Sequence, residues 1–306
     1  MTPRIANPSP PQPDQPSFAW PPKESISAEP ILTPSPPTES SSSARPIFDS
    51  IETHLLGRTG LAFDQWAQRN NWQRDTQDAY CWRCGSSIGP HESDGEGCAQ
   101  CRSKALPWDR TIRLAPYKDT LRTEILILKF QAWRPTGQGL GKHLGLAIAE
   151  QLELAQIDPT RALLAPIPTH RFRRIARGVD HTMVLARAAA IASNTKAAPL
   201  LKTRYRPEQV GLSMTARAKN IKDAFSLTQR GQRILNKSKK APPLVIILID
   251  DVRTTGATFV AASKALKSAF KAQLKAKSWQ DDPPQLWIAC LGVAGESRRR
   301  DIEAQS

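Results

Sequence analysis

The 306-residue chain has no long hydrophobic run. Its longest uninterrupted apolar stretch, residues 244–249, contains six residues, whereas about 20 consecutive apolar residues are needed to cross a bilayer. The first ten residues, MTPRIANPSP, also lack the apolar core of a secretory signal. We therefore expect no membrane span and a cytoplasmic location.

Acidic residues are scarce in one long segment. Residues 161–240 contain 18 Lys and Arg against three Asp and Glu, a surplus of +15 that equals the formal net charge of the whole chain. This pattern is typical either of a basic face that binds phosphates, free or polymeric, or of an ordinary solvated surface. Aromatic residues, on which unpaired bases stack, are few in the same segment: Phe172, Tyr205 and Phe225.

Apolar periodicity is missing from the start of the chain, where 13 of the 26 prolines fall within the first 50 residues. A Pro- and Ser-rich composition buries too little apolar surface to offset the entropy of ordering, so we expect a disordered tail. Composition then divides the chain into that tail (1–46), a short helical segment (47–77), a cysteine-containing unit (78–106), a main domain (107–297) and a disordered C-terminus (298–306).

Within the main domain, strand and helix patterns alternate. This alternation predicts an α/β fold in which helices flank a mostly parallel sheet. The expected strands are 110–117, 162–167, 244–250 and 285–293, the expected helices are 120–131, 140–156, 171–193 and 257–270, and a basic loop is expected at 231–243.

Four cysteines form two closely spaced pairs, Cys81 with Cys84 and Cys98 with Cys101, separated by 13 residues. Two CxxC turns supply the four thiolates of a tetrahedral Zn²⁺ site, and a site filled by four protein ligands is structural rather than catalytic. The alternative is a redox-active or disulfide-forming pair. We expect His91, between the pairs, to be a bystander and Cys290, in an apolar strand, to be a core residue.

The segment 245–258, VIILIDDVRTTGAT, combines an apolar strand, two acids and a hydroxyl-rich turn before a helix. Backbone N–H groups at a helix N-terminus suit a phosphate, and a glycine allows the backbone to approach it closely. Two carboxylates beside a phosphate site repel the anion unless they accept hydrogen bonds from ribose hydroxyls or hold Mg²⁺ through its waters. The alternative is a capped helix that follows two surface acids. The residues concerned are Asp250, Asp251, Thr254, Thr255, Gly256, Ala257 and Thr258.

This segment resembles the phosphoribosyl pyrophosphate (PRPP) motif of type I phosphoribosyltransferases, except that Arg253 stands where an apolar residue is more usual. A zinc ribbon ahead of such a domain is similar to the ComF/GntX family. Further matches are Lys129, the Pro166–Pro168 strand end followed by His170 and Arg171, the Arg177–Gly178 pair, and the stretch Gln209, Leu212, Ser213, Arg217, Asn220, Ala224 and Phe225. The Phe, Asn and Gln that follow the Arg–Gly pair in the family are replaced by Val179, Asp180 and His181.

The resemblance implies Mg²⁺-dependent PRPP binding in a context of competence, the uptake of DNA, with single-stranded DNA and a competence helicase as partners. Lys129 and Arg177 are candidates for a catalytic role, and His170 and Arg171 for the pyrophosphate side, although each of these cations also suits a plain surface. Three hypotheses remain open: a phosphoribosyltransferase that releases pyrophosphate, a non-catalytic module that binds single-stranded DNA, and a scaffold whose Pro-rich tail recruits partners.

Overall fold

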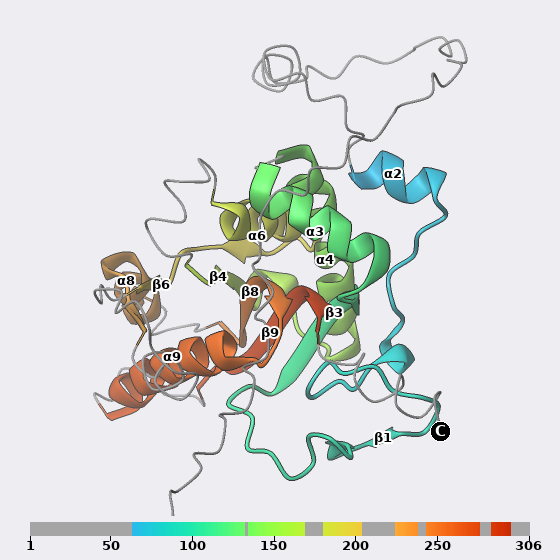
Figure 1. Cartoon of the computed structure of the whole chain (residues 1–306). Helices are drawn as coiled ribbons and strands as arrows, with labels where there is room; N and C mark the ends of the chain where they lie inside the picture. The colour runs from blue at the N-terminus through green and yellow to red at the C-terminus, as the bar shows by residue number, and fades with distance from the viewer. Residues whose placement is uncertain are drawn as a thin grey trace, which may run out of the picture. The chain divides into compact units, whose positions relative to one another are not determined.

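In the computed structural model of this chain, five parallel strands form a central sheet in the order β3–β9–β8–β4–β5 (Figure 1). The middle strand reads VIILI over its first five residues, all buried, as is typical of a parallel strand covered on both faces. The mixed α/β fold predicted from the sequence is confirmed. The strands are β3 (Arg110–Pro116), β9 (Gln285–Val293), β8 (Val245–Arg253), β4 (Ala162–Pro166) and β5 (Lys196–Ala197).

The structure describes residues 63–131, 134–168, 180–203, 224–237, 243–275 and 283–294. The predicted tail, the greater part of the predicted helical segment 47–77 and the predicted C-terminal end therefore lie outside the described residues. All described residues belong to one compact unit, Thr59–Ser306. Among them, no helix is both long and apolar enough to cross a membrane.

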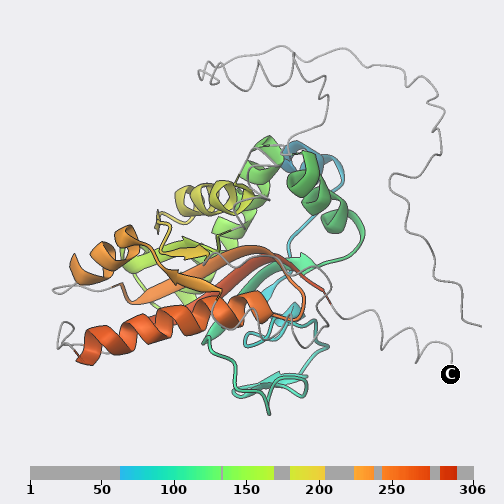
Figure 2. The ribbon, with the colours of Figure 1, turned by 60° about the vertical axis from the view of Figure 1, so that its left-hand side comes forward.

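Helices cover both faces of the sheet, as Figures 1 and 2 show. One face packs against α3 (Asp119–Gln131), α4 (Arg134–Leu154) and α6 (His181–Ala192), with the short α2 (Phe63–Arg69) against α4. The other face packs against α9 (Ala257–Lys275), α8 (Gln229–Lys237) and a small antiparallel pair, β6 (Leu201–Thr203) with β7 (Phe225–Leu227). The short 3₁₀ turns η1 (Gln77–Ala79) and η2 (Pro159–Arg161) complete the helical elements described.

The side chains of β8 alternate between the two hydrophobic cores. Ile247 and Ile249 belong to the core under α3, α4 and α6, whereas Ile246 and Leu248 belong to the core under α9. Successive residues of a strand point to opposite faces, so each core receives every second side chain. This alternation also decides where the acids at the end of β8 point.

Several predicted elements have different ends in the structure. The strand predicted at 244–250 continues to Arg253, because β8 stays paired with β9 up to Val293. The helix predicted at 257–270 runs on to Lys275. The helix predicted at 140–156 instead begins at Arg134 and ends at Leu154. In the stretch predicted as largely helical, 171–193, the described helix is α6, and 171–179 lies outside the described residues.

The prediction of a loop at 231–243 was wrong over its first part, because α8 occupies Gln229–Lys237. Thr228 Oγ1 accepts a hydrogen bond from the Gly231 N–H at 2.8 Å and so caps the start of this helix. Leu235 is fully buried and anchors the helix in the core under α9. The helix was not predicted because its sequence, QRGQRILNK, contains a glycine and several cations and has few apolar residues.

Candidate functional site

The hydroxyl-rich turn links the end of β8 to the start of α9. Thr254, Thr255 and Thr258 are exposed, so their hydroxyls are accessible to a ligand. Gly256 has φ +81°, a left-handed conformation that residues with a Cβ rarely adopt. The Ala257 N–H donates to Thr255 Oγ1 at 3.3 Å, and α9 begins at Ala257 as predicted. The turn thus presents exposed threonine side chains beside the positive end of a 19-residue helix.

The two acids that precede the turn have different surroundings. Both belong to β8 rather than to the loop, and strand alternation directs Asp251 toward α3 and α6 and Asp250 toward the opposite face. Asp250 Oδ1 accepts a hydrogen bond from the Asp251 N–H at 2.9 Å. They are therefore not a symmetrical pair of carboxylates.

Asp251 is nearly buried and lies between two basic side chains from different helices. Lys129 Nζ, from α3, is 3.1 Å from Asp251 Oδ1, and His181 Nε2, from α6, is 3.0 Å from Asp251 Oδ2. Each carboxylate oxygen thus has its own partner. This cluster connects the two helices to the end of β8, close to the turn.

The two acids have opposite shifts in pKa. Removal from water, reinforced by the negative charge of Asp251, raises the pKa of Asp250 to about 8. Burial also acts against ionisation of Asp251, but the hydrogen bond from His181 and the charge of Lys129 outweigh it and lower the pKa of Asp251. These shifts favour the ionised form of Asp251 and the protonated form of Asp250.

Most of the basic residues expected to have a catalytic role or to lie on the pyrophosphate side are outside the described residues. Lys129 is described and contacts Asp251, whereas His170, Arg171 and Arg177 lie outside the described residues. Their proposed roles stay predictions. His181 was the residue missed: the sequence showed it only as a departure from the family pattern after the Arg–Gly pair, one residue after Asp180, whose side chain caps α6 through the Met183 N–H.

The four cysteines of the two CxxC pairs lie together. Their sulfurs are all within 4.8 Å of one another and all four residues are buried. The distances are 3.7 Å for Cys81–Cys101, 3.6 Å for Cys84–Cys98 and 3.8 Å for Cys98–Cys101. A tetrahedral ion with metal–sulfur bonds of about 2.3 Å requires sulfur separations of about 3.8 Å, whereas a disulfide requires about 2.05 Å. The group is zinc-ribbon-like and can bind a metal ion.

The backbone around the cysteines is shaped for this cluster. The strands β1 (Ser93–Asp94) and β2 (Gly97–Cys98) form a small antiparallel hairpin that carries the second pair. Gly97 has φ +98°, and a Cβ at this position lies 2.8 Å from Cys101 Sγ. The Cys98 N–H donates to Cys81 Sγ at 3.3 Å, a contact that stabilises a thiolate. His91 is exposed and outside the group, and Cys290 is fully buried in the sheet core, with its pKa raised by burial to about 12.

A tryptophan connects the cysteine group to the hydroxyl-rich turn. Trp108 Nε1 donates to the carbonyl of Arg83, which lies between Cys81 and Cys84, at 3.0 Å, and to Thr111 Oγ1 at 3.1 Å. Its ring packs against Phe259 of α9, and its Cη2 atom lies 3.5 Å from the position that a Cβ on Gly256 would take. One buried side chain thus contacts both candidate sites.

No family model matches this chain. It is 28% identical to competence protein F of Haemophilus influenzae over 192 residues, which are 61% of this chain and 78% of that protein. The chain is a homologue of competence protein F. The ComF resemblance inferred from the motifs is thereby confirmed. The chain is also 25% identical to the DNA utilization protein YhgH of Escherichia coli and of Shigella flexneri over 218 residues, 69% of this chain and 88% of each of those proteins.

Proposed function

We propose that this ComF homologue acts in DNA uptake or utilisation and binds PRPP with Mg²⁺ at the turn between β8 and α9. The names of its relatives, competence protein F and DNA utilization protein, support the first part. The observation that carries the second part is the placement of Asp250 and Asp251 at the end of β8, directly before exposed threonines at the N-terminus of a long helix.

In this proposal, Thr254 to Thr258 hold the 5′-phosphate through hydroxyls and the backbone N–H groups of the turn. Among described residues, Asp250 accepts one backbone hydrogen bond and keeps capacity for a ribose hydroxyl. Asp251, whose two oxygens face Lys129 and His181, supports the site from behind. Any transfer of phosphoribose with release of pyrophosphate depends on positioning and on charge stabilisation rather than on a protein nucleophile.

We propose zinc as the ion of the cysteine group. The sulfur separations of 3.6–3.8 Å fit a tetrahedral ion with bonds of zinc–thiolate length. Four thiolates fill the coordination sphere, so the ion folds the ribbon and takes no part in chemistry.

Calorimetric titration of the metal-loaded chain with PRPP and Mg²⁺ tests the ligand. Saturable binding is expected, with loss of at least tenfold in affinity in Asp250→Asn/Asp251→Asn. Glu153→Gln, an exposed carboxylate on α4, is the matched control and is expected to bind as the parent does. A folded, metal-loaded parent that does not bind PRPP would show this part of the proposal to be wrong.

A non-catalytic role is the second candidate, since both oxygens of the described carboxylate Asp251 already have protein partners, Lys129 and His181. Pyrophosphate release in the presence of PRPP and a panel of nucleobases separates the two. Binding without release favours a binding module, whereas release favours a transferase.

A further inference from the structure

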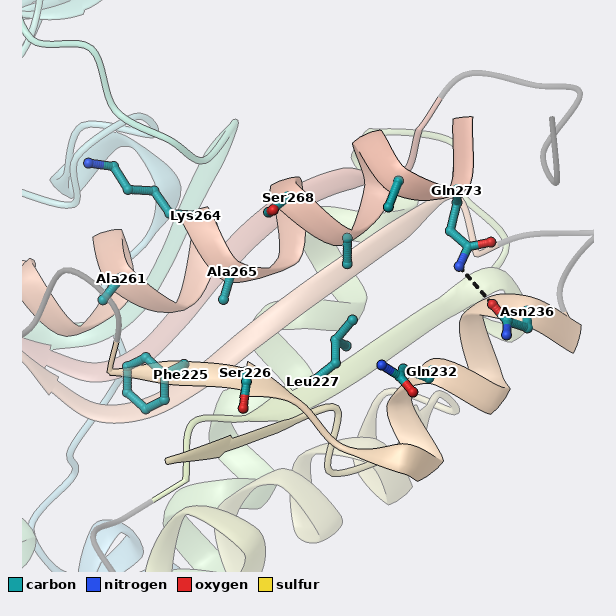
Figure 3. Close-up of a pocket in the computed structure, with 12 residues that line it drawn as sticks. Phe225, Ser226, Leu227, Gln232, Asn236, Ala261, Lys264, Ala265, Ser268 and Gln273 are labelled. Carbon is teal, nitrogen blue, oxygen red and sulfur yellow. Dashed lines mark hydrogen bonds between the residues drawn. The ribbon is translucent and has the colours of Figure 1, made fainter. Parts of the chain in front are cut away.

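The face of the molecule that carries α8 and α9 holds a groove without acidic residues. The groove has a volume of about 650 Å³ and lies between α9 on one side and β7 with α8 on the other (Figure 3). The elements β6, β7, α8 and α9 together contain eight Lys and Arg and no Asp or Glu. The lack of acidic residues in the groove lining and in these four elements favours binding of a polyanion.

The groove has an apolar floor. Ala261 and Ala265 of α9 face Phe225 and Leu227 of β7 across it, as Figure 3 shows. Short side chains on α9 keep this floor open along almost the whole helix, because its lining residues recur at helical spacing from Ala261 to Gln273. Ala261 and Phe225 are buried, whereas Leu227, Ala265 and Ala269 are half-buried and Ala272 is exposed. The apolar surface that the last four leave accessible suits the flat surfaces of unpaired bases.

Cations border the groove along one edge of α9. Lys264 lines the groove, and Lys271 and Lys275 follow it at intervals of seven and four residues, which places all three along the same side of the helix. Lys264 and Lys271 are exposed. The three lysines, one to two helical turns apart, place a row of positive charges along the groove. Such a row can bind the successive phosphates of a nucleic acid strand.

Amide side chains lie on the opposite wall. Gln232 and Asn236 of α8 line the groove, and Gln273 Nε2 donates to Asn236 Oδ1 at 2.7 Å, which links the two helices at one end. Amides offer both donors and acceptors, which match the exposed edges of unpaired bases. In a duplex the pairing edges and the faces of the bases are not accessible to these amides and to the apolar floor. An acidic peptide has no bases for them to contact.

We propose that this groove binds a single strand of nucleic acid, with its phosphates on the lysine edge of α9 and its bases over the alanine floor. The inference deepens the DNA-related part of the proposed function and does not depend on PRPP binding. It assigns the interaction to α8, β7 and α9.

The test is the binding of a fluorescent 20-nucleotide oligothymidylate to the full-length, metal-loaded chain by anisotropy, between 50 and 200 mM salt. Lys264→Gln/Lys271→Gln is expected to weaken binding roughly tenfold at 100 mM salt. The slope of log affinity against log salt is expected to fall by about 1.4, since each phosphate contact on a single strand contributes about 0.7. Arg134→Gln/Arg187→Gln, two exposed cations on α4 and α6, is the charge-matched control and is expected to bind within twofold of the parent.

A second variant distinguishes a groove from a diffusely charged face. Ala265→Phe fills the floor without a change in charge, so we expect weaker binding with an unchanged salt slope. Thermal unfolding checks that this variant folds, and Ser268→Trp, at an exposed lining position, replaces it if it does not.

The proposal is overturned if the parent does not bind the oligonucleotide, if the control loses as much affinity as the lysine variant, or if the floor variants bind as the parent does. Displacement by poly-glutamate at equal charge concentration also overturns it, in favour of an acidic protein partner. The groove variants are expected to bind PRPP with the affinity of the parent. Loss of oligonucleotide binding can therefore be distinguished from loss of PRPP binding.

Discussion

At the scale of single residues, the acid pair at the end of β8 has an uneven distribution of charge. Asp251 has a lysine and a histidine for its two oxygens, whereas Asp250 is held away from water with a single backbone donor among the described contacts. The two positions look equivalent in the sequence. Their roles separate because a strand sends neighbouring side chains to opposite faces.

The raised pKa of Asp250 predicts a pH-dependent cost in stability. In the unfolded chain this carboxyl loses its proton near 3.8, but in the folded chain only near 8. Unfolding therefore releases a proton between these values, so the contribution of Asp250 to stability falls as the pH rises from 4 to 8. Asp250→Asn is expected to exceed the parent in free energy of unfolding by on the order of 2 kcal/mol at pH 8.5 and to lose that advantage at pH 4.

Urea denaturation of both proteins across this range, at constant metal occupancy, provides the measurement. A difference that does not change with pH would contradict the raised pKa.

Lys129 and Asp251 are expected to depend on each other. Lys129→Met leaves Asp251 nearly buried with His181 alone, so unfolding free energy is expected to fall by about 2–3 kcal/mol. Asp251→Asn in the same chain removes the uncompensated charge and is expected to restore part of that loss. A double-mutant cycle from urea denaturation measures the coupling, and additive effects would show that the contact carries no energy.

At the scale of elements, the cysteine hairpin depends on a glycine. A Cβ on Gly97 would lie 2.8 Å from Cys101 Sγ, and the residue has a positive φ, so Gly97→Ala has to displace one sulfur of the four-cysteine group. We expect a drop in zinc affinity of at least tenfold, measured by competition with a chromophoric chelator. Gly95→Ala is the matched control two residues away, because a Cβ there has no neighbour within 4 Å. Equal affinities for the two variants would contradict the steric argument.

The sequence predicted long, strongly patterned elements better than short ones. The strands β8 and β9 were predictable from their continuous apolar runs, and the two CxxC pairs were recognisable from the spacing of the cysteines alone. α8 was mistaken for a loop because its capping threonine and the single buried Leu235 give no periodic signal. The strands β5, β6 and β7 are two or three residues long, too short for any pattern.

Only the part of the candidate site that lies in one continuous segment of the sequence could be predicted. Asp250, Asp251 and the threonines lie in one segment, so their order in the sequence revealed them. The partners of Asp251 come from α3 and α6, 122 and 70 residues earlier in the chain, and only folding brings them together. Sequence matching suggested Lys129, whereas nothing local singled out His181.

At the scale of the whole molecule, a buried arginine fastens the cysteine unit to the sheet. Arg113 of β3 donates to the Gly85 carbonyl at 2.7 Å and to Asp75 Oδ2 at 2.8 Å, and its guanidinium lies 5.1 Å from the centre of the Tyr80 ring. A forked cation reaches several acceptors at once, which a lysine does not. The cysteine unit and the main domain therefore share polar contacts in the interior.

Arg113→Met removes these donors and leaves a nearly full-sized side chain. The free energy of unfolding is expected to fall by about 3 kcal/mol, because the carboxylate of Asp75 and the carbonyl of Gly85 each lose a charged donor. Arg113→Lys is expected to recover less than half of this loss. Chemical denaturation of the metal-loaded proteins measures both losses. An Arg113→Met variant with the unfolding free energy of the parent would contradict the stabilising role of Arg113.

Trp108 contacts both candidate sites: it donates to the carbonyl of Arg83, between Cys81 and Cys84, and lies against Gly256 in the hydroxyl-rich turn. When two ligands are coupled through one shared side chain, each changes the equilibrium affinity for the other by the same factor. An occupant of the turn that immobilises Trp108 is then expected to raise the affinity of the cysteine group for zinc, and loss of zinc is expected to lower the affinity of the turn for its occupant by the same factor. The affinity for zinc, measured by competition with a chelator, would thereby report whether the hydroxyl-rich turn is occupied.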